Sequence, residues 1–326
     1  MENIKDFPSR LGYACLNTVL RKEKPSVFCS RTARISTIKE KGIDYVKELG
    51  RQNILDMEKM ILWNEKHGIR FMRMSSDMFP FASHDVYGYS VAYAKDELKK
   101  IGVLAKKLGH RLTTHPGQTN NLGSPTEKVV LATRRDLAYH AEMLDLMGLD
   151  ADSVMIIHMG GTYGNKEETI ARFEKEFLLL PENVRNRLVL ENDEICYNTE
   201  EILPICEKLK IPLVFDWHHH SINPGTVPLD VLLQRIKAIW ITRGIKQKMH
   251  YSESRPNAVS VMERRAHSDY VEVVPMCGND VDLMIEAKMK EAAVLRIMEK
   301  YGIGEHSTYG KHDSAYSIDN TSREIE

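Results

Sequence analysis

Residues 187–218 read RLVLENDEICYNTEEILPICEKLKIPLVFDWH, and this stretch decides the fold. It begins with a short apolar run, RLVLEND (187–193), and ends with another, PLVFDWH (212–218). Between the two runs, residues 200–209 form an amphipathic segment of helical length. Two buried strands joined by a helix make a parallel unit, because a parallel strand pair needs a crossover connection. The stretch therefore predicts one strand, helix and strand unit of a parallel sheet.

The same alternation extends in both directions along the chain. Near-continuous apolar strands indicate a sheet covered by helices, and eight such units close into a barrel. We therefore predict a single-domain (β/α)8 TIM barrel over residues 1–304, and a flexible polar tail over residues 305–326. The strands are expected at residues 11–17, 69–75, 111–115, 153–159, 187–193, 212–218, 246–252 and 282–288, and the helices at 52–67, 94–108, 127–147, 167–179, 200–209, 229–239 and 288–301.

The composition excludes several classes of protein. The chain has 326 residues with 45 Lys and Arg against 46 Asp and Glu, which is neither fibrous nor disordered. No stretch approaches the roughly 20 apolar residues that span a bilayer, so we expect no membrane contact. Its beginning also lacks the apolar core of a signal peptide. Five cysteines without a CxxC pair argue against a disulfide framework and a structural zinc site.

Positive charge is concentrated in two segments. Residues 1–41 hold nine basic and four acidic residues, a sum of +5, and residues 235–265 hold eight basic and two acidic residues, a sum of +6. The whole chain carries only −1, so the remainder must carry about −12. Recognition of a polyanion depends on where charge lies and not on its sum. The two segments modestly favour a nucleic-acid partner.

Each expected strand ends in a residue that can do chemistry. The carboxyl ends of barrel strands converge at the open rim, where TIM-barrel enzymes place their active sites. A single histidine or carboxylate there would be unremarkable, whereas a complete set indicates a site. The strand ends and the loops directly after them contribute Tyr13, Ser75, His84, His115, His158, Glu191, Asp216, His218, His219, His250 and Glu286.

The residue types at these ends indicate metal ions. Histidine and carboxylate without cysteine suit Mn, Fe or Zn acting as a Lewis acid. Seven or eight such side chains exceed the needs of one ion and suggest two or three, as in phosphoryl displacement. A Ser, His and Asp arrangement lacks a nucleophile elbow, and no GxGxxG or GxxxxGK motif indicates a nucleotide cofactor.

The expected seventh strand adds a lysine to the site. Side chains at i and i+2 share a face of a strand, so Lys248 points the same way as His250. An ammonium would repel metal ions, so Lys248 must bind phosphate, lose its proton or be converted to an anion, unless it reaches the rim. The same alternation places His218 on the side of Asp216 and favours it over His219.

Seven motifs of this chain resemble those of the UV-damage endonuclease family, a relative of the endonuclease IV type of abasic-site nucleases. They are RLGYACLN, FMRMSSDMFPFASH, THPGQ, IHMGG, LVLEND, VFDWHHH and KMHYSESRP, and they extend from residue 10 to about residue 290. The resemblance implies a (β/α)8 barrel with three divalent ions, Mn2+ or alternatively Zn2+ or Mg2+. It also implies incision of damaged double-stranded DNA directly 5′ to a UV photoproduct, leaving a 3′-hydroxyl and a 5′-phosphate.

The resemblance assigns ligands to the three ions. One ion would be held by His115, His158 and Glu191, with Glu191 bridging to a second ion. The second ion would also be held by Asp216, His250 and Glu286. The third ion would be held by His219 and His267, close to Lys248. In this family that lysine is carboxylated, which would make it an anion, and the family spacing Asp-x-x-His selects His219 over His218.

Further roles follow from the same resemblance. Tyr13 and His84 would line the site, and together with Glu191 and Lys248 they form the expected catalytic set. Gln118 would enter the DNA opposite the lesion. Its neighbour Thr119 departs from the family, which usually has Tyr or Phe there, and Asn120 or Leu122 could fill the gap instead. Among the basic residues, we expect DNA contacts from Arg255, Arg264 and Arg265.

Two other functions fit parts of the pattern. A sugar isomerase or epimerase of the xylose-isomerase type shares the barrel and a set of Glu, Asp and His ligands. It needs only two ions and a small closed pocket, which leaves His219, His267 and the basic segment without a role. A non-catalytic damage-binding barrel should lack ligands. We expect a monomeric endonuclease, located in the cytoplasm with the nucleoid of a prokaryote or in the nucleus of a eukaryote.

Overall fold

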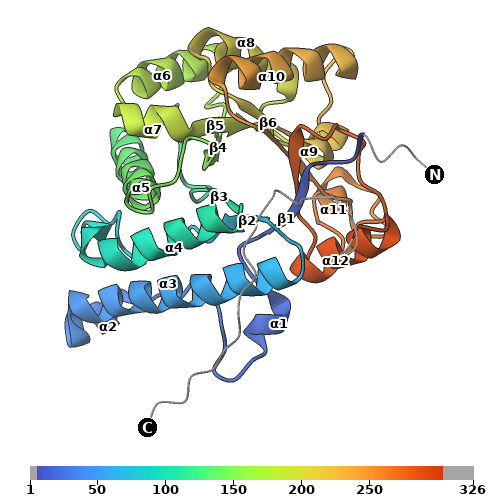
Figure 1. The fold of residues 1–326 in the computed structure, drawn as a ribbon. Helices are drawn as coiled ribbons and strands as arrows, with labels where there is room; N and C mark the ends of the chain where they lie inside the picture. The colour runs from blue at the N-terminus through green and yellow to red at the C-terminus, as the bar shows by residue number, and fades with distance from the viewer. Residues whose placement is uncertain (1–5, 304–326) are drawn as a thin grey trace.

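In the computed structural model, which describes residues 6–303, eight parallel strands close into one barrel in the order β1 to β8 (Figure 1). Every neighbouring pair is parallel, including β1 with β8. This confirms the predicted TIM barrel, and each strand lies within three residues of its predicted ends. The strands are β1 (Arg10–Ala14), β2 (Phe71–Met74), β3 (Arg111–Thr114), β4 (Met155–His158), β5 (Leu188–Glu191), β6 (Leu213–Asp216), β7 (Gln247–Tyr251) and β8 (Val281–Ile285).

Helices surround the barrel and cover its outer face (Figure 1). All seven predicted helices are present, and five short ones were not predicted. The helices are α1 (Thr18–Arg21), α2 (Ile35–Lys41), α3 (Ile43–Lys66), α4 (Lys95–Lys107), α5 (Glu127–Leu146), α6 (Lys166–Leu178), α7 (Glu182–Arg187), α8 (Thr199–Leu209), α9 (Trp217–Ile222), α10 (Leu229–Arg243), α11 (Val261–Arg264) and α12 (Lys290–Lys300).

Helix α3 begins nine residues before its predicted start, and Gly50 lies inside it. A glycine normally weakens a helix interior, so a sequence pattern favours a start after it. Here a Cβ at Gly50 would lie 2.7 Å from the Tyr93 hydroxyl and 2.9 Å from the Phe79 ring. The helix therefore passes through Gly50 because only glycine lets these two rings pack against it.

The barrel interior is packed below its open rim. Ala14, Phe71 and Met284 form a small buried cluster separate from the main core, which lies between the strands and the helices. Gly12 makes room for this packing, because a Cβ there would lie 2.4 Å from the Phe71 carbonyl oxygen. Access is therefore left at the carboxyl ends of the strands, as in other barrels of this type.

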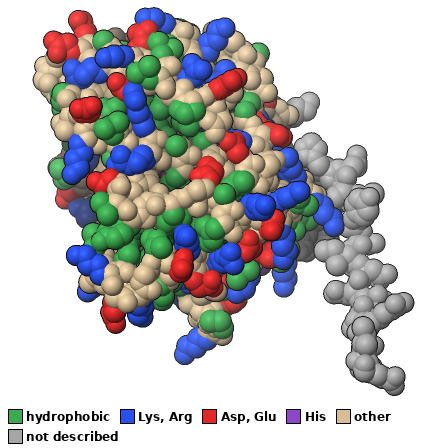
Figure 2. Space-filling model, turned by 90° about the vertical axis from the view of Figure 1, so that its left-hand side faces the viewer, with side chains coloured by type: hydrophobic (Ala, Val, Ile, Leu, Met, Phe, Trp, Pro, Cys, Tyr) green, Lys and Arg blue, Asp and Glu red, His purple; other side chains and the backbone are tan. Residues whose placement is uncertain are grey.

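The described part of the chain contains no helix long and apolar enough to cross a bilayer. On the face of the molecule shown in Figure 2, Lys and Arg side chains are interspersed with Asp, Glu and hydrophobic ones. No part of that face therefore suggests a polyanion-binding surface. The predicted tail, residues 305–326, lies outside the described residues.

Candidate metal centre

The strand register brings the predicted ligands together at the carboxyl rim. His158 ends β4 and pairs in register with Glu191, which ends β5. Asp216 ends β6 and pairs in register with His250 of β7. Glu286 follows the last residue of β8. Six adjacent strands thus deliver His115, His158, Glu191, Asp216, His250 and Glu286 to one end of the barrel.

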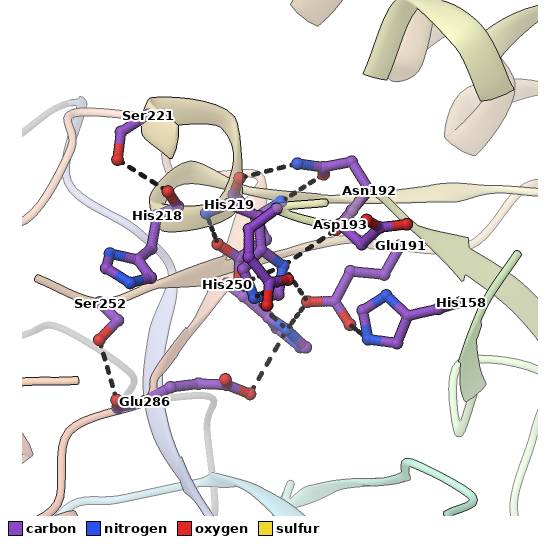
Figure 3. A network of polar contacts seen from close by, with 12 residues as sticks. His158, Glu191, Asn192, Asp193, His218, His219, Ser221, His250, Ser252 and Glu286 are labelled. Atoms are coloured by element: carbon purple, nitrogen blue, oxygen red, sulfur yellow. Dashed lines mark hydrogen bonds and ion pairs between the residues drawn. The ribbon is translucent and has the colours of Figure 1, made fainter. Parts of the chain in front are cut away.

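The carboxylate of Glu191 lies at the centre of the first group. Its Oε2 atom is 3.1 Å from His115 Nε2 and 3.4 Å from His158 Nε2. Its Oε1 atom is 2.7 Å from His250 Nδ1. Figure 3 shows Glu191 between His158 and His250, with the two rings directed at its two oxygens. Glu191 can therefore serve ions on both of its sides.

A second group also forms around His250. Its Nδ1 atom is 3.5 Å from Glu286 Oε1 and 3.9 Å from Asp216 Oδ2. Glu286 also forms a close ion pair with Arg73 of β2, which sequence reasoning missed. Arg73 could have been predicted as a site residue because it is the single charged residue in the apolar run FMRM. Arg73 offsets part of the negative charge of this group.

His219 joins Glu191 and Asp216 in a third group. Its Nδ1 atom is 3.8 Å from Glu191 Oε1 and 3.7 Å from Asp216 Oδ2. Helix α9 begins directly after Asp216, whose carboxylate caps it by accepting a 2.7 Å hydrogen bond from the His219 backbone. Strand alternation therefore ends at Asp216, and the preference for His218 from alternation is wrong. The His218 ring points away from Glu191 (Figure 3) and packs edge-on against His267.

These residues form three overlapping ligand groups, in each of which the candidate ligand atoms lie within 4.8 Å of one another. Glu191 and Asp216 each belong to two of them. Within residues 6–303, the buried Asp216 Oδ2 has no hydrogen-bond partner, and an unpartnered buried carboxylate oxygen is costly. An anionic oxygen in need of a partner, among imidazoles and carboxylates, fits divalent cations such as Mn2+ or Zn2+. The groups are His115, His158 and Glu191; Glu191, Asp216 and His219; and Asp216, His250 and Glu286.

The pKa values of the cluster show that it attracts positive charge. Burial alone would raise the pKa of Glu191, but His250, His158 and His115 hold it well below its usual value. Burial, with Glu191 and Glu286 nearby, raises the pKa of Asp216 to about 7. Burial would lower the pKa of His219, yet Asp216, Glu191 and Glu194 raise it to about 9. The raised pKa values of Asp216 and His219 mean that these two side chains favour bound protons when no metal ion is present.

Lys248 lies inside the barrel and is completely buried. Its Nζ atom donates a 3.0 Å hydrogen bond to the Thr113 hydroxyl and lies over the Phe71 ring. Burial, together with Arg73 and Arg111, holds the pKa of Lys248 well below its usual value. The side chain is buried inside the barrel and does not reach the rim.

Three other predicted residues lie outside the ligand groups. His267 donates from Nδ1 to the Glu286 carbonyl at 2.6 Å and so borders the centre, but none of the three groups found in residues 6–303 includes it. His84 lies in the β2–α4 loop, where its Nδ1 accepts from two backbone amides. Tyr13 is buried outside the barrel interior, since its hydroxyl donates to Asn64 of α3 at 2.7 Å. The expectation that Tyr13 lines the site is therefore wrong.

The predicted lesion probe lies at the mouth of a pocket next to the metal centre. Gln118 lines this pocket with His115, His158, Glu194 and Arg265, and both Gln118 and Thr119 are exposed. The alternatives for Thr119 are excluded by their packing. Asn120 is buried and donates to the Gly117 carbonyl and Asp136, and Leu122 is fully buried in the core.

The predicted DNA-contacting arginines lie between β7 and β8, and Arg265 reaches toward the centre. Arg265 donates from Nε to Glu194 Oε1 at 2.7 Å, and Arg264 donates to the Ser221 carbonyl at 2.8 Å. Arg255 pairs with Glu263 at 3.2 Å. Glu194 was not predicted, although its other oxygen is 3.6 Å from His219 Nε2. Glu194 directly follows the LEND motif, but it lies in a loop, where strand periodicity does not predict the direction of a side chain.

The chain is similar to known proteins over most of its length. A sequence model of the family described as UV-endonuclease UvdE matches residues 9–314. The UV-damage endonuclease of Schizosaccharomyces pombe is 53% identical over 302 residues, which cover 90% of this chain and 50% of that protein. That of Neurospora crassa is 46% identical over 337 residues, covering 90% and 51%. The chain thus spans about half the length of these curated relatives. The crystal structure of SacUVDE superposes with a TM-score of 0.77 at 30% identity, covering 90% of this chain and 99% of that one.

Proposed function

The chain belongs to the UV-endonuclease UvdE family, and from this membership and its metal centre we propose that it is a DNA repair endonuclease. It cuts the backbone of duplex DNA directly 5′ to UV photoproducts such as pyrimidine dimers and leaves a 3′-hydroxyl and a 5′-phosphate. The observation that carries the proposal is the sharing of Glu191 and Asp216 among three ligand groups at the open end of the barrel. Several ions side by side suit displacement at phosphorus.

The ligand groups would hold up to three divalent ions, with Mn2+ proposed and Zn2+ or Mg2+ as alternatives. His115, His158 and Glu191 would hold one ion, and Glu191 would also serve a second ion with Asp216, His250 and Glu286. His219 and His267 would complete a third position. When bound, the ions would supply Lewis acidity, which stabilises charge on a phosphate and acidifies a water molecule.

The protein's own contribution is to hold these ligands before substrate arrives. The side chain of Asn192 pins the end of β5 to β6, since it donates to the Asp216 carbonyl at 3.0 Å and accepts from the Asp216 backbone at 2.8 Å. The Asn192 carbonyl lies 2.9 Å from His219 Nδ1 and orients that ring. Ligands fixed in this way need little rearrangement when a phosphodiester enters.

Lys248 is suited to become an anion. Burial lowers the pKa of Lys248 and so favours the neutral, nucleophilic form of its amine. Its Nζ atom could form a bond to the carbon of CO2 and release a proton, which would leave a carbamate with two oxygens. Such a carbamate would turn a repulsive neighbour of the ions into an attractive one. We therefore propose carboxylation of Lys248 in the active protein.

The lesion is read at the pocket mouth, where Gln118 and Thr119 are exposed. The duplex must be bent and the damaged bases drawn out of the stack, which costs least where damage has already weakened pairing. Arg264 and Arg265 lie near this pocket and would meet phosphates. We propose that the protein acts as a monomer on damaged double-stranded DNA, without a nucleotide cofactor, at the nucleoid or in the nucleus.

Nicking of supercoiled plasmid tests the proposal. Irradiated and unirradiated plasmid are incubated with the protein and Mn2+, with and without a chelator. We expect nicks only in irradiated plasmid and only without chelator, and a sequencing gel should place them directly 5′ to pyrimidine dimers with extendable 3′-hydroxyls. Equal nicking of both plasmids would contradict damage recognition. Epimerisation of a ketose without any nicking would support the sugar epimerase instead.

A further inference from the structure

The loop between β7 and β8 carries a protrusion, residues 254–267, whose base lies against the metal centre. An isolated bridge pairs Ser254 with His267, and the backbone N–H of Arg255 donates to the Ala266 carbonyl at 2.8 Å. The base is fixed further by the hydrogen bond from His267 to the Glu286 carbonyl at 2.6 Å. The protrusion is thus an extension of the rim that holds the proposed ligands.

The tip of the protrusion is held rigid by its own hydrogen bonds. Ser260 and Glu263 form a capping box at the start of α11. The Glu263 carboxylate also accepts from the Val259 backbone at 3.1 Å. The Ser254 hydroxyl ties the other side by donating to the Arg264 carbonyl at 2.8 Å. A partner that meets this tip need not order it first, which lowers the cost of binding.

Three apolar side chains project from this rigid tip. Val259 is 86% exposed, Val261 is 57% exposed and Met262 is 70% exposed. Single exposed apolar residues are ordinary, whereas three within four residues on a preorganised protrusion indicate a contact surface. We call Val259, Val261 and Met262 the apolar tip.

The charge around the apolar tip identifies its partner. Residues 254–267 contain three arginines and one glutamate, a formal sum of +2. Arg265 contacts the Met262 sulfur at 3.6 Å and lines the same pocket as Gln118. The tip therefore stands beside the mouth of the pocket proposed to receive the lesion. Apolar side chains flanked by arginines are typical of proteins that press into the minor groove and bend the duplex.

We propose that the apolar tip is a second DNA-contacting element, which packs against the minor-groove face of the duplex beside the lesion and helps to bend it. The inference rests on the proposed function and adds an apolar contact to it. Its contribution comes from removing the tip from water when DNA is bound. The contribution is therefore independent of salt, unlike that of the neighbouring arginines.

The test uses the full chain with both Val261→Ser and Met262→Ser. Binding to a UV-irradiated, end-labelled duplex is followed by anisotropy, and bending by energy transfer between the ends. We expect the affinity to fall about tenfold and the bend to decrease, with an unchanged slope of log affinity against log salt. Met262→Leu should keep both properties. The matched control is Ile241→Ser, which is 68% exposed on the outer helix α10 and should behave as wild type.

A second variant separates apolar from ionic contacts. Arg264→Ala with Arg265→Ala should flatten the salt slope by up to roughly 0.9 per lost phosphate contact. Wild-type affinity and bending in the double serine variant would overturn the inference, and so would a change in its sedimentation without DNA, since the tip would then cover a second copy of the chain. Wild-type protein that nicks irradiated plasmid keeps the proposed function intact in either case.

Discussion

The two ends of the barrel hold buried charge in opposite ways. At the amino ends of the strands, the carboxylate of Asp282 lies 3.0 Å from Arg111, 3.5 Å from Lys246 and 3.7 Å from Arg10. At the carboxyl ends, three carboxylates converge among imidazoles, with Arg73 as their close cation. The amino end pairs its buried anion with cations of the chain, whereas the carboxyl end has more anions than cations.

The difference in charge balance indicates that one end of the barrel contributes to stability and the other to function. Arg10 and Lys246 are partly exposed, so surplus positive charge at the amino end reaches water. Glu191 and Asp216 are buried at the carboxyl end, where water cannot solvate them. Buried anions without matching cations cost free energy unless a cation arrives from outside. The charges at the amino end therefore stabilise the fold, and those at the carboxyl end could bind metal ions.

The largest effect is expected at the carboxyl end. Glu191→Gln should lower nicking of irradiated plasmid about a thousandfold or more at saturating Mn2+, because it removes an anionic ligand from two of the proposed ion positions at once. Binding to damaged duplex should remain largely intact, since Glu191 is buried beneath the surface proposed to contact DNA. Gel electrophoresis of the plasmid and anisotropy of a labelled duplex measure the two properties. Substantial nicking by this variant would show that Glu191 does not bridge ions.

The amino end should respond in the opposite way. Asp282→Asn leaves Arg111 buried without its carboxylate, which should lower the free energy of unfolding by about 3 kcal/mol. Urea unfolding of the metal-free protein measures this loss. The rise in melting temperature on addition of Mn2+ should be retained, because no proposed ligand is changed. The comparison between the ends would fail if Asp282→Asn abolished the response to Mn2+.

Most candidate ligands at the carboxyl end could be predicted from the sequence, because parallel strands in a barrel place their carboxyl ends next to one another. Glu191, Asp216, His158 and His115 were found from strand ends alone, before any contact was known. The prediction that Tyr13 lines the site is wrong, and the alternation of side chains along β1 could have shown this. Gly12 and Ala14 face the packed interior, so the residue between them faces outward.

Other parts of the site could not be read from periodicity. The position of His219 depends on a helix that begins directly after Asp216, and the spacing Asp-x-x-His is also the spacing of an N-cap with the third helical amide. Glu194 and Arg265 meet only because two loops, 71 residues apart in sequence, fold over the same rim. Loop contacts of this kind have no local sequence pattern.

A smaller effect is expected at the amino end from Glu65. Burial alone would raise its pKa, but hydrogen bonds from His110 and Arg70 lower it to about 2. A folded-state pKa below the unfolded value of about 4.3 stabilises the protein fully above pH 5, and this stabilisation is lost as the pH falls toward 2. Glu65→Gln should therefore cost about 1–2 kcal/mol at pH 7 and less at pH 3. Urea unfolding at both pH values measures the difference, and a constant difference would refute the assigned ion pair.

The smallest effect is expected at the rim loop that carries Gln118 and Thr119, because neither side chain belongs to the charge networks of the two ends. An aromatic ring stacked on a base contributes about 1–3 kcal/mol, whereas threonine offers a methyl contact and a hydrogen bond. Thr119 is exposed, so a ring there should gain the lower part of this range. Thr119→Tyr should raise the ratio of affinities for damaged and undamaged duplex about fivefold, and Gln118→Ala should lower it.

The nicking rate at saturating substrate distinguishes the effects of changes in this loop from those of changes in the metal centre. Both variants should cut at close to the wild-type rate once DNA is bound, because neither residue is a proposed ligand, while Glu191→Gln binds without cutting. Recognition and chemistry would then be shown to lie in different parts of the same rim. An unchanged affinity ratio in both Thr119→Tyr and Gln118→Ala would mean that another element reads the lesion. The apolar tip, which contacts the pocket residue Arg265 through Met262, would then be the first place to look.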